Sequence, residues 1–161
     1  MGVGKTTVGK AMAKATGREF VDLDQEIEHR TGVSIPTIFD IEGEAGFRKR
    51  ECEIIEEFTA RENMVIATGG GAVVNPDNRR AIQASGLVIY LTASIDKLVQ
   101  RTRNSRNRPL LNADDPHKVL RELMAVREPI YREAADLVVE VDDRAPGTLS
   151  KKILKMIKEL E

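Results

Sequence analysis

Short apolar runs alternate with amphipathic, helix-like segments along the 161 residues of the chain. The run LVIYL at 87–91 is apolar throughout, which is typical of a strand covered on both faces of a sheet. Four strands are predicted, at residues 19–24, 64–67, 87–91 and 137–141. Helices are predicted at residues 5–15, 25–30, from 34 onward, 44–61, 75–84, 94–102, 117–135 and 146–160. Because strands alternate with helices, the pattern predicts a three-layer α/β/α fold with a parallel sheet.

The first residues are typical of a phosphate-binding loop. Gly4-Lys5-Thr6-Thr7 is the second half of the pattern G-x-x-x-x-G-K-[ST], in which backbone N–H groups at a helix N-terminus hold phosphate oxygens. Lys5 is expected to reach the β- and γ-phosphates, and the Thr6 hydroxyl to ligate Mg²⁺. The first glycine of the pattern and the apolar strand that leads into it are not in the sequence, so we expect a fifth, central strand upstream of Met1.

Two acids stand at the end of the predicted strand 19–24. Residues two apart in an extended segment project to the same side, so the carboxylates of Asp22 and Asp24 are expected to face one site. In a parallel α/β sheet, such a site lies beyond the carboxyl ends of the strands. One acid is expected to bind Mg²⁺ or its water, and the other to accept a proton from a substrate hydroxyl. The alternative is an N-cap for the next helix, a role open to Asp24.

The segment TGGG at 68–71 follows the predicted strand 64–67 directly. Glycines have no side chain, so a ligand can approach the backbone N–H groups of such a loop closely. A tight turn is the alternative, although one or two glycines would suffice for it. The strand ends without an acid, so the metal-binding role is assigned to Asp22.

Arginines are the other candidate ligands for anions. Arg48 lies on the predicted helix 44–61, and a guanidinium can hold a carboxylate through two parallel hydrogen bonds. The stretch 100–111 contains four arginines and fits a nucleic-acid patch, a solvated loop or a mobile lid over transferring phosphates. The near-zero net charge and the absence of nearby aromatics argue against the nucleic-acid patch. Taken alone, Arg48 and Arg127 are each also compatible with a solvated helix face.

Composition and charge limit the class of protein. The formal net charge of −1 provides no field that would attract nucleic acid or a membrane surface. Cys52 is the single cysteine, which excludes an intrachain disulfide and fits a reducing cytosol. No apolar run approaches the ~18 residues of a membrane span. We therefore expect one domain, residues 1–161, in the cytoplasm.

Taken together and in order, these motifs resemble the shikimate kinases. The resemblance covers essentially the whole chain and rests on MGVGKTT, DLDQEIEHRTG, IFDIEGEAGFRKRE, ATGGGAV, RNRPLL and REPIYREAAD. It implies the fold of the P-loop kinases, a monomer, and transfer of the γ-phosphoryl group of ATP, with Mg²⁺, to the 3-hydroxyl of shikimate. That reaction is a step in aromatic amino-acid (chorismate) biosynthesis. The resemblance also implies a substrate-binding region at about 23–62 and a lid at about 103–117.

The resemblance also implies a role for each matching residue. Asp24 binds the ring hydroxyls and accepts the proton, Asp22 supports Mg²⁺ with Thr6, and Glu51 orients Arg48. The implied catalytic residues are Lys5, Asp24 and Arg108. The implied shikimate ligands are Asp24, Arg48, Gly69, Gly70, Gly71 and Arg127, with the two arginines on the carboxylate. The implied ATP ligands are Gly2, Val3, Gly4, Lys5, Thr6, Thr7, Arg101, Arg108, Arg144 and Pro146.

Three alternatives remain from the sequence. The first is another small-metabolite kinase of the same architecture, acting on gluconate or a nucleoside monophosphate. The second is a nucleotide-binding switch, which the absence of an Asn-Lys-x-Asp guanine-reading segment disfavours. The third is a catalytically inactive chain, because a domain without its central strand would lose a large part of its core.

Overall fold

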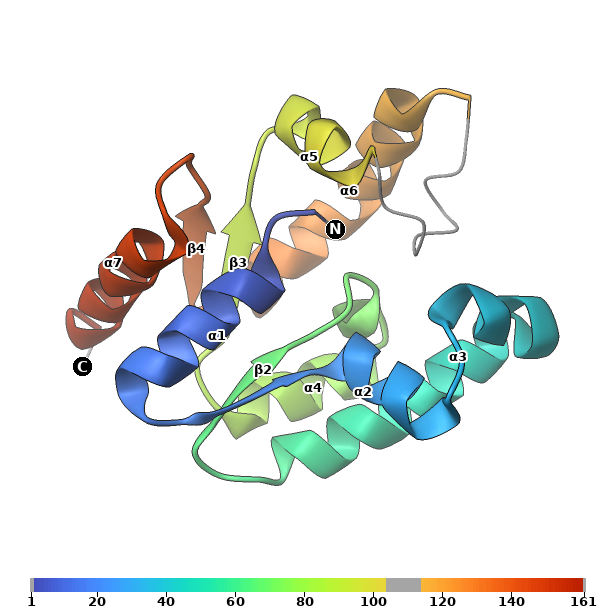
Figure 1. Cartoon of the computed structure of the whole chain (residues 1–161), viewed down its shortest axis with the longest axis horizontal. Helices are drawn as coiled ribbons and strands as arrows, with labels where there is room; N and C mark the ends of the chain where they lie inside the picture. Colours follow the sequence, from blue (N-terminus) through green and yellow to red (C-terminus); the bar gives the residue numbers. More distant parts are fainter. Residues whose placement is uncertain (1, 104–113, 161) are drawn as a thin grey trace.

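The computed structural model of the chain describes residues 2–103 and 114–160 (Figure 1). The elements follow in the order α1 (Lys5–Thr16), β1 (Glu19–Asp22), α2 (Leu23–Thr31), α3 (Ile35–Thr59), β2 (Met64–Ala67), η1 (Ala72–Val74), α4 (Pro76–Ser85), β3 (Ile89–Thr92), α5 (Ile95–Thr102), α6 (Pro116–Ala134), β4 (Leu137–Glu140) and α7 (Pro146–Lys158). The predicted alternation of helices and strands is confirmed, including all four strands.

Helix ends follow signals that are local in the sequence. The side chains of Ser34, Asn75 and Ser94 accept backbone N–H groups in the first turns of α3, α4 and α5. Helices α1 and α2 end at Gly17 (φ 66°) and Gly32 (φ 71°), both in the left-handed conformation that glycine adopts at little cost. These caps explain why the predicted helix boundaries agree with the structure to within one or two residues.

Two differences from the predicted boundaries are near the site; elsewhere β3 begins at Ile89 rather than at residue 87, and β4 ends at Glu140 rather than at residue 141. Strand β1 ends at Asp22 rather than at residue 24, because α2 begins at Leu23. The helices predicted from 34 and over 44–61 form one element, α3, with a break at Gly43 (φ 71°, ψ −179°). Glycine is the residue that takes this positive φ without strain, so the break falls where the sequence permits it.

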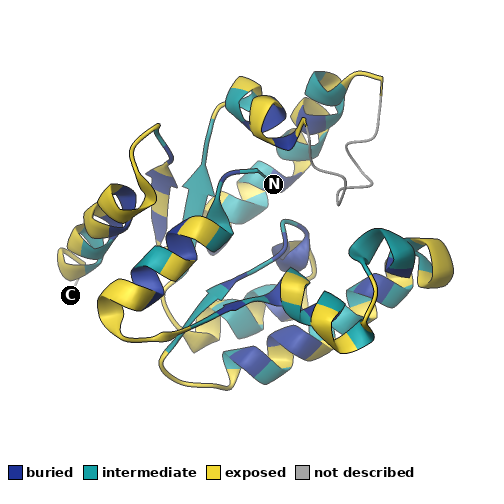
Figure 2. Cartoon of the chain, viewed as in Figure 1, coloured by how far each residue is buried: buried dark blue, intermediate teal, exposed yellow. Residues whose placement is uncertain are grey.

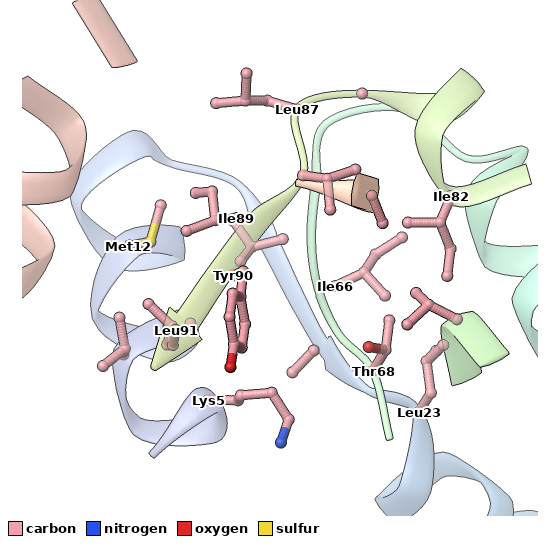
Figure 3. Close-up of a pocket in the computed structure, with 18 of the residues that line it drawn as sticks. Lys5, Met12, Leu23, Ile66, Thr68, Ile82, Leu87, Ile89, Tyr90 and Leu91 are labelled. Atoms are coloured by element: carbon pink, nitrogen blue, oxygen red, sulfur yellow. The ribbon is translucent and has the colours of Figure 1, made fainter. Parts of the chain in front are cut away.

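The strands form two parallel pairs. Strand β1 pairs with β2, with Asp22 opposite Ala67, and β3 pairs with β4, with Thr92 opposite Glu140. The parallel pairing is as predicted, but within the described residues no strand hydrogen-bonds β2 to β3, and the predicted fifth strand has no counterpart there. A cavity of about 320 Å³ lies between these two strands (Figure 3). We call it the strand cavity; its walls include Val65, Ile66 and Ala67 of β2, Ile89, Tyr90 and Leu91 of β3, and Val8, Gly9 and Met12 of α1.

The hydrophobic core divides in the same way as the sheet. One buried cluster joins α1, α5, α6, α7 and β4, and the other joins β1, α2 and α3. Figure 2 shows buried and exposed segments alternating along α3. The apolar side predicted for this helix is confirmed, since Phe47, Ile54, Ile55 and Phe58 are all buried.

Candidate functional site

Three chain segments meet at one end of the strands. Strand β1 ends at Asp22, β2 leads into residues 68–71, which we call the glycine loop, and α1 begins at Lys5. Because β1 and β2 are parallel, their carboxyl ends lie at the same edge. Figure 3 shows Lys5, Thr68 and Leu23 at one end of the strand cavity. The site therefore lies beyond the carboxyl ends of the strands, as predicted for this class of fold.

The start of α1 has the backbone conformation of an anion-binding loop. Gly2 (φ 70°) and Gly4 (φ 94°) are both left-handed, and Gly4 caps α1 without a side-chain hydrogen bond. No side chain caps this helix start, and the helix dipole attracts negative charge to it. Thr7 is exposed, and Val3 is buried in the core.

Helix α5 packs directly against this loop. A Cβ added to Gly2 would lie 2.7 Å from Cγ2 of Thr102, so the close approach requires glycine. From the same helix, Arg101 donates a hydrogen bond from Nη1 to the Val3 carbonyl at 3.2 Å. The structure therefore brings Arg101 to the phosphate loop, where a nucleotide would lie.

The predicted metal ligands are adjacent. Thr6 Oγ1 donates to Asp22 Oδ2 at 2.5 Å, between residues 16 positions apart in sequence. Among the described residues no group of three or more His, Cys, Asp or Glu side chains could hold a metal. Mg²⁺ is usually bound through one or two carboxylates together with substrate phosphates and water. The hydroxyl and carboxylate of Thr6 and Asp22 therefore fit a magnesium ion that arrives with a nucleotide.

The two acids do not share one face of a strand, and this part of the prediction is wrong. Asp22 is the N-cap of α2, and its Oδ1 accepts the N–H groups of Asp24 at 3.1 Å and Gln25 at 3.2 Å. Asp24 lies in the first turn of α2. The cap role that was left open to Asp24 belongs to Asp22, because a carboxylate before a helix stabilises the first turn. The turn nevertheless directs both carboxylates to the same end of the strands.

Asp24 and Glu51 converge on the first glycine of the loop. A Cβ added to Gly69 would lie 2.8 Å from Asp24 Oδ1 and 3.1 Å from Glu51 Oε2. Glu51 is only 2% exposed, and its Oε2 has no hydrogen-bond partner in the described part of the chain. Burial raises the pKa of the Glu51 carboxyl, while Arg48 opposes that shift. The glycine is needed because two carboxylates of the protein occupy the space of its side chain.

Arg48 is fixed beside the last glycine of the loop. Its Nη1 donates to Glu51 Oε1 at 2.8 Å, and its Nη2 to Glu44 Oε1 at 3.3 Å. Its guanidinium also lies 5.2 Å from the centre of the Phe47 ring. A Cβ added to Gly71 would lie 2.5 Å from both Nη atoms. Arg48 therefore does not lie on a solvated helix face but is held against the glycine loop.

Arg127 comes to the same place from α6. Its side chain is buried, which is uncommon for an arginine and requires nearby negative charge or a ligand. A cavity of about 680 Å³, which we call the arginine cavity, is lined by Arg48, Arg127 and Gly71 together with Cys52, Asn75 and Asn78. Two guanidiniums that face one cavity form a site for an anion such as a carboxylate. The structure thus brings together two arginines that lie 79 positions apart in the sequence.

The other predicted ATP ligands lie near α5. Arg144 is exposed and its Nε lies 2.7 Å from Asp142 Oδ2; Pro146 is the first residue of α7. Lys97 of α5 lies 2.8 Å from Asp143, and Lys97 and Arg101 lower the pKa of that carboxyl. The turn before α7 therefore faces α5. Arg108 and residues 104–113 of the predicted lid lie outside the described residues.

One residue of the site was missed by the sequence analysis. Tyr131 of α6 donates a hydrogen bond from its hydroxyl to the Gly70 carbonyl. It lies one helical turn after Arg127, so it shares that helix face, and this spacing was the available signal. Its partner lies 61 positions away, which no local pattern indicates.

Comparisons with known proteins agree with the geometry. A family model described as shikimate kinase matches residues 1–158. The chain is 53% identical over 161 residues to the shikimate kinase of Bordetella avium (strain 197N), covering all of this chain and 77% of that protein. It is 50% identical over 160 residues to that of Pseudomonas aeruginosa (strain LESB58), covering 93% of that protein. Among solved structures it is similar to a shikimate kinase from Acinetobacter baumannii in complex with shikimate, with a TM-score of 0.97 and 45% identity, over 100% of this chain and 90% of that one.

Proposed function

We propose that this chain, which belongs to the shikimate kinase family, transfers the γ-phosphoryl group of ATP to the 3-hydroxyl of shikimate. The observation that carries the proposal is the arginine cavity, in which Arg48 and Arg127 face one space beside the glycine loop. A small carboxylated polyol has little apolar surface, so its affinity must come from charge-assisted hydrogen bonds of about 1.5–3 kcal/mol each. Two guanidiniums provide such bonds for the carboxylate.

Shikimate would lie with its carboxylate in the arginine cavity and its ring hydroxyls toward Asp24. The Asp24 carboxylate is close to Gly69, and Gly69 and Gly71 belong to the same short loop. One ligand can therefore reach both Asp24 and the arginines. Asp24 is suited to hold the proton that leaves the 3-hydroxyl as the oxygen–phosphorus bond forms.

ATP would bind at the N-terminus of α1, with Lys5 and the loop N–H groups on its phosphates. Arg101, Arg144 and Pro146 would hold the adenine, and Arg108 would contact both phosphate and substrate. Thr6 and Asp22, whose oxygens are adjacent, would hold Mg²⁺, which neutralises charge on the phosphates when it is bound. Phosphoryl transfer depends mostly on positioning and charge neutralisation, and these residues can provide both.

The cellular location, oligomeric state and partners of the enzyme are part of the same proposal. No helix in the described ranges is long and apolar enough to cross a membrane. We place the chain in the cytoplasm as a monomer that binds neither nucleic acid nor membrane. The formal net charge of −1 supports only the last part, because it provides no field that would attract nucleic acid or a membrane surface.

A coupled assay of ADP release with shikimate, gluconate or AMP as acceptor tests the proposal. ADP release is expected with shikimate and not with gluconate or AMP. Release with one of the other two acceptors would reassign the substrate. Arg127→Ala is expected to raise the KM for shikimate by about tenfold or more with little change in the KM for ATP, since it removes charge-assisted bonds to one substrate only. The matched control is Arg132→Ala, because Arg132 is on the same helix but pairs with Glu128 at the surface. Equal losses for both substrates in Arg127→Ala would refute the placement of the carboxylate.

A further inference from the structure

Tyr131 connects α6 to the glycine loop. Its hydroxyl donates to the Gly70 carbonyl, and its ring packs against Tyr90 of β3 with centroids 5.1 Å apart and planes at 46°. Burial raises the pKa of its phenol, so the hydroxyl stays protonated and remains a donor. The ring contact fixes the side chain independently of the hydrogen bond, and the hydroxyl then determines where the Gly70 carbonyl points.

The orientation of this carbonyl determines that of the next amide. A trans peptide is planar, so the C=O of Gly70 and the N–H of Gly71 point in opposite directions. Gly70 and Tyr131 line the strand cavity, whereas Gly71 lines the arginine cavity with Arg48 and Arg127. In the described part of the chain, the N–H of Gly71 donates no backbone hydrogen bond. Because Tyr131 holds the carbonyl, the N–H of this peptide is expected on the opposite side, where Gly71 lines the arginine cavity.

Glycine makes this restraint necessary. Gly70 and Gly71 have few steric limits on φ and ψ, so the peptide between them would otherwise rotate easily. The next hydrogen bonds of the loop, from Ala72 N–H to the Gly69 carbonyl and from Val74 N–H to the Gly71 carbonyl, leave the Gly70 carbonyl unrestrained. Among the described residues, the hydroxyl of Tyr131 is the group that holds it.

We propose that Tyr131 is a positioning residue for substrate: it holds the Gly70–Gly71 peptide so that the N–H of Gly71, already a shikimate ligand by the resemblance, faces the anionic group bound by Arg48 and Arg127. This inference rests on the proposed function, since it takes the carboxylate of shikimate as that anionic group. Tyr131 itself does not touch the substrate. Arg127 interacts with the same hydroxyl and opposes the rise in its pKa, so Tyr131 acts through the backbone and through Arg127, in both cases at the anionic end of the ligand.

Isothermal titration of shikimate and of ATP into the wild-type chain and the Tyr131→Phe variant tests the inference. Phenylalanine keeps the ring contact with Tyr90 and removes only the hydroxyl. The Kd for shikimate is expected to rise about five- to tenfold, which corresponds to one weakened hydrogen bond, while the Kd for ATP stays within about twofold. Tyr90→Phe is the matched control, because it removes the neighbouring hydroxyl and leaves the glycine loop untouched; its Kd for shikimate is expected to stay at the wild-type value.

A ligand without the carboxylate separates positioning from general stability. With a shikimate analogue that carries a hydroxymethyl group in place of the carboxylate, Tyr131→Phe and wild type are expected to bind equally. In wild type, the Gly71 amide proton is expected to shift downfield in a ¹H–¹⁵N spectrum when shikimate is added, and this measurement requires no variant. An unshifted Gly71 amide, an equal loss for shikimate and its analogue, or an equal loss in Tyr90→Phe would overturn the inference. Failure of the wild-type chain to bind shikimate would instead refute the proposed function.

Discussion

Alanine at Gly71 would test the position of Arg48 by steric displacement. The added Cβ would lie 2.5 Å from Nη1 and Nη2 and 2.7 Å from Cζ of the guanidinium. Favourable contacts between heavy atoms are about 3.5–4.0 Å, so the guanidinium must move by about 1 Å. The backbone of Gly71 (φ −92°, ψ −5°) suits alanine, so the substitution adds no backbone strain.

The expected effect follows from the bonds of Arg48. A displacement of about 1 Å lengthens its 2.8 Å bond to Glu51 beyond hydrogen-bond range and moves the guanidinium away from the arginine cavity. Loss of one charge-assisted hydrogen bond to the substrate carboxylate costs about 1.5–3 kcal/mol, which raises the KM for shikimate roughly ten- to 100-fold. The KM for ATP should be nearly unchanged, because neither Gly71 nor Arg48 is among the expected ATP ligands.

Steady-state kinetics with each substrate varied in turn measures both constants. Gly86→Ala is the control, since a Cβ there meets no atom within 4 Å and φ is 162°, an extended conformation. A wild-type KM for shikimate in Gly71→Ala would refute the position assigned to Arg48. A comparable rise of the KM for shikimate in Gly86→Ala would show that the effect comes from replacing a glycine in general and not from displacing Arg48.

Two further predictions concern the acids of the site. Asp22→Asn is expected to raise the Mg²⁺ concentration for half-maximal activity about tenfold or more, with little change in Tm, because asparagine caps α2 about as well as aspartate does; an unchanged Mg²⁺ titration would contradict the assigned metal role. The pKa of Glu51 is raised above its ordinary 4.5 by burial, so its neutral form stabilises the fold fully below that pH and the stabilisation is lost as pH rises through the folded-state pKa. As the pH is raised from 4 to 8, the Tm of the wild-type chain should therefore fall relative to the Tm of Glu51→Gln. A difference in Tm between the two that stays constant with pH would contradict this prediction.

Much of the site was predictable because its signals are short motifs. The phosphate loop, the glycine loop and the caps at Ser34 and Asn75 depend on atoms within a few residues of one another. Their backbone conformations are therefore nearly the same in any fold that contains them. The alternation of strands and helices in turn restricted the architecture to a parallel α/β fold, because parallel strands require crossover helices.

The prediction that Asp22 and Asp24 both belong to the strand failed at the point where two local signals compete. Period-two alternation extends the strand to Asp24, whereas a carboxylate before Leu23 favours a helix start. Helix packing decided the outcome, since Leu23 and Ile27 are buried among the core side chains of α3. The burial of a helix face is a tertiary effect that the strand pattern does not contain.

The sequence by itself determined the local elements, the motifs and the family they belong to, because these depend on neighbours along the chain. Only the tertiary structure decided which side chain occupies the space at each glycine, which arginines share a cavity, and that Tyr131 holds the Gly70 carbonyl. Such contacts join residues tens of positions apart, and their distances depend on how helices pack on strands. The strand cavity between β2 and β3 is a feature of the same kind, since it depends on the spacing of two strand pairs that share no hydrogen bond within the described residues.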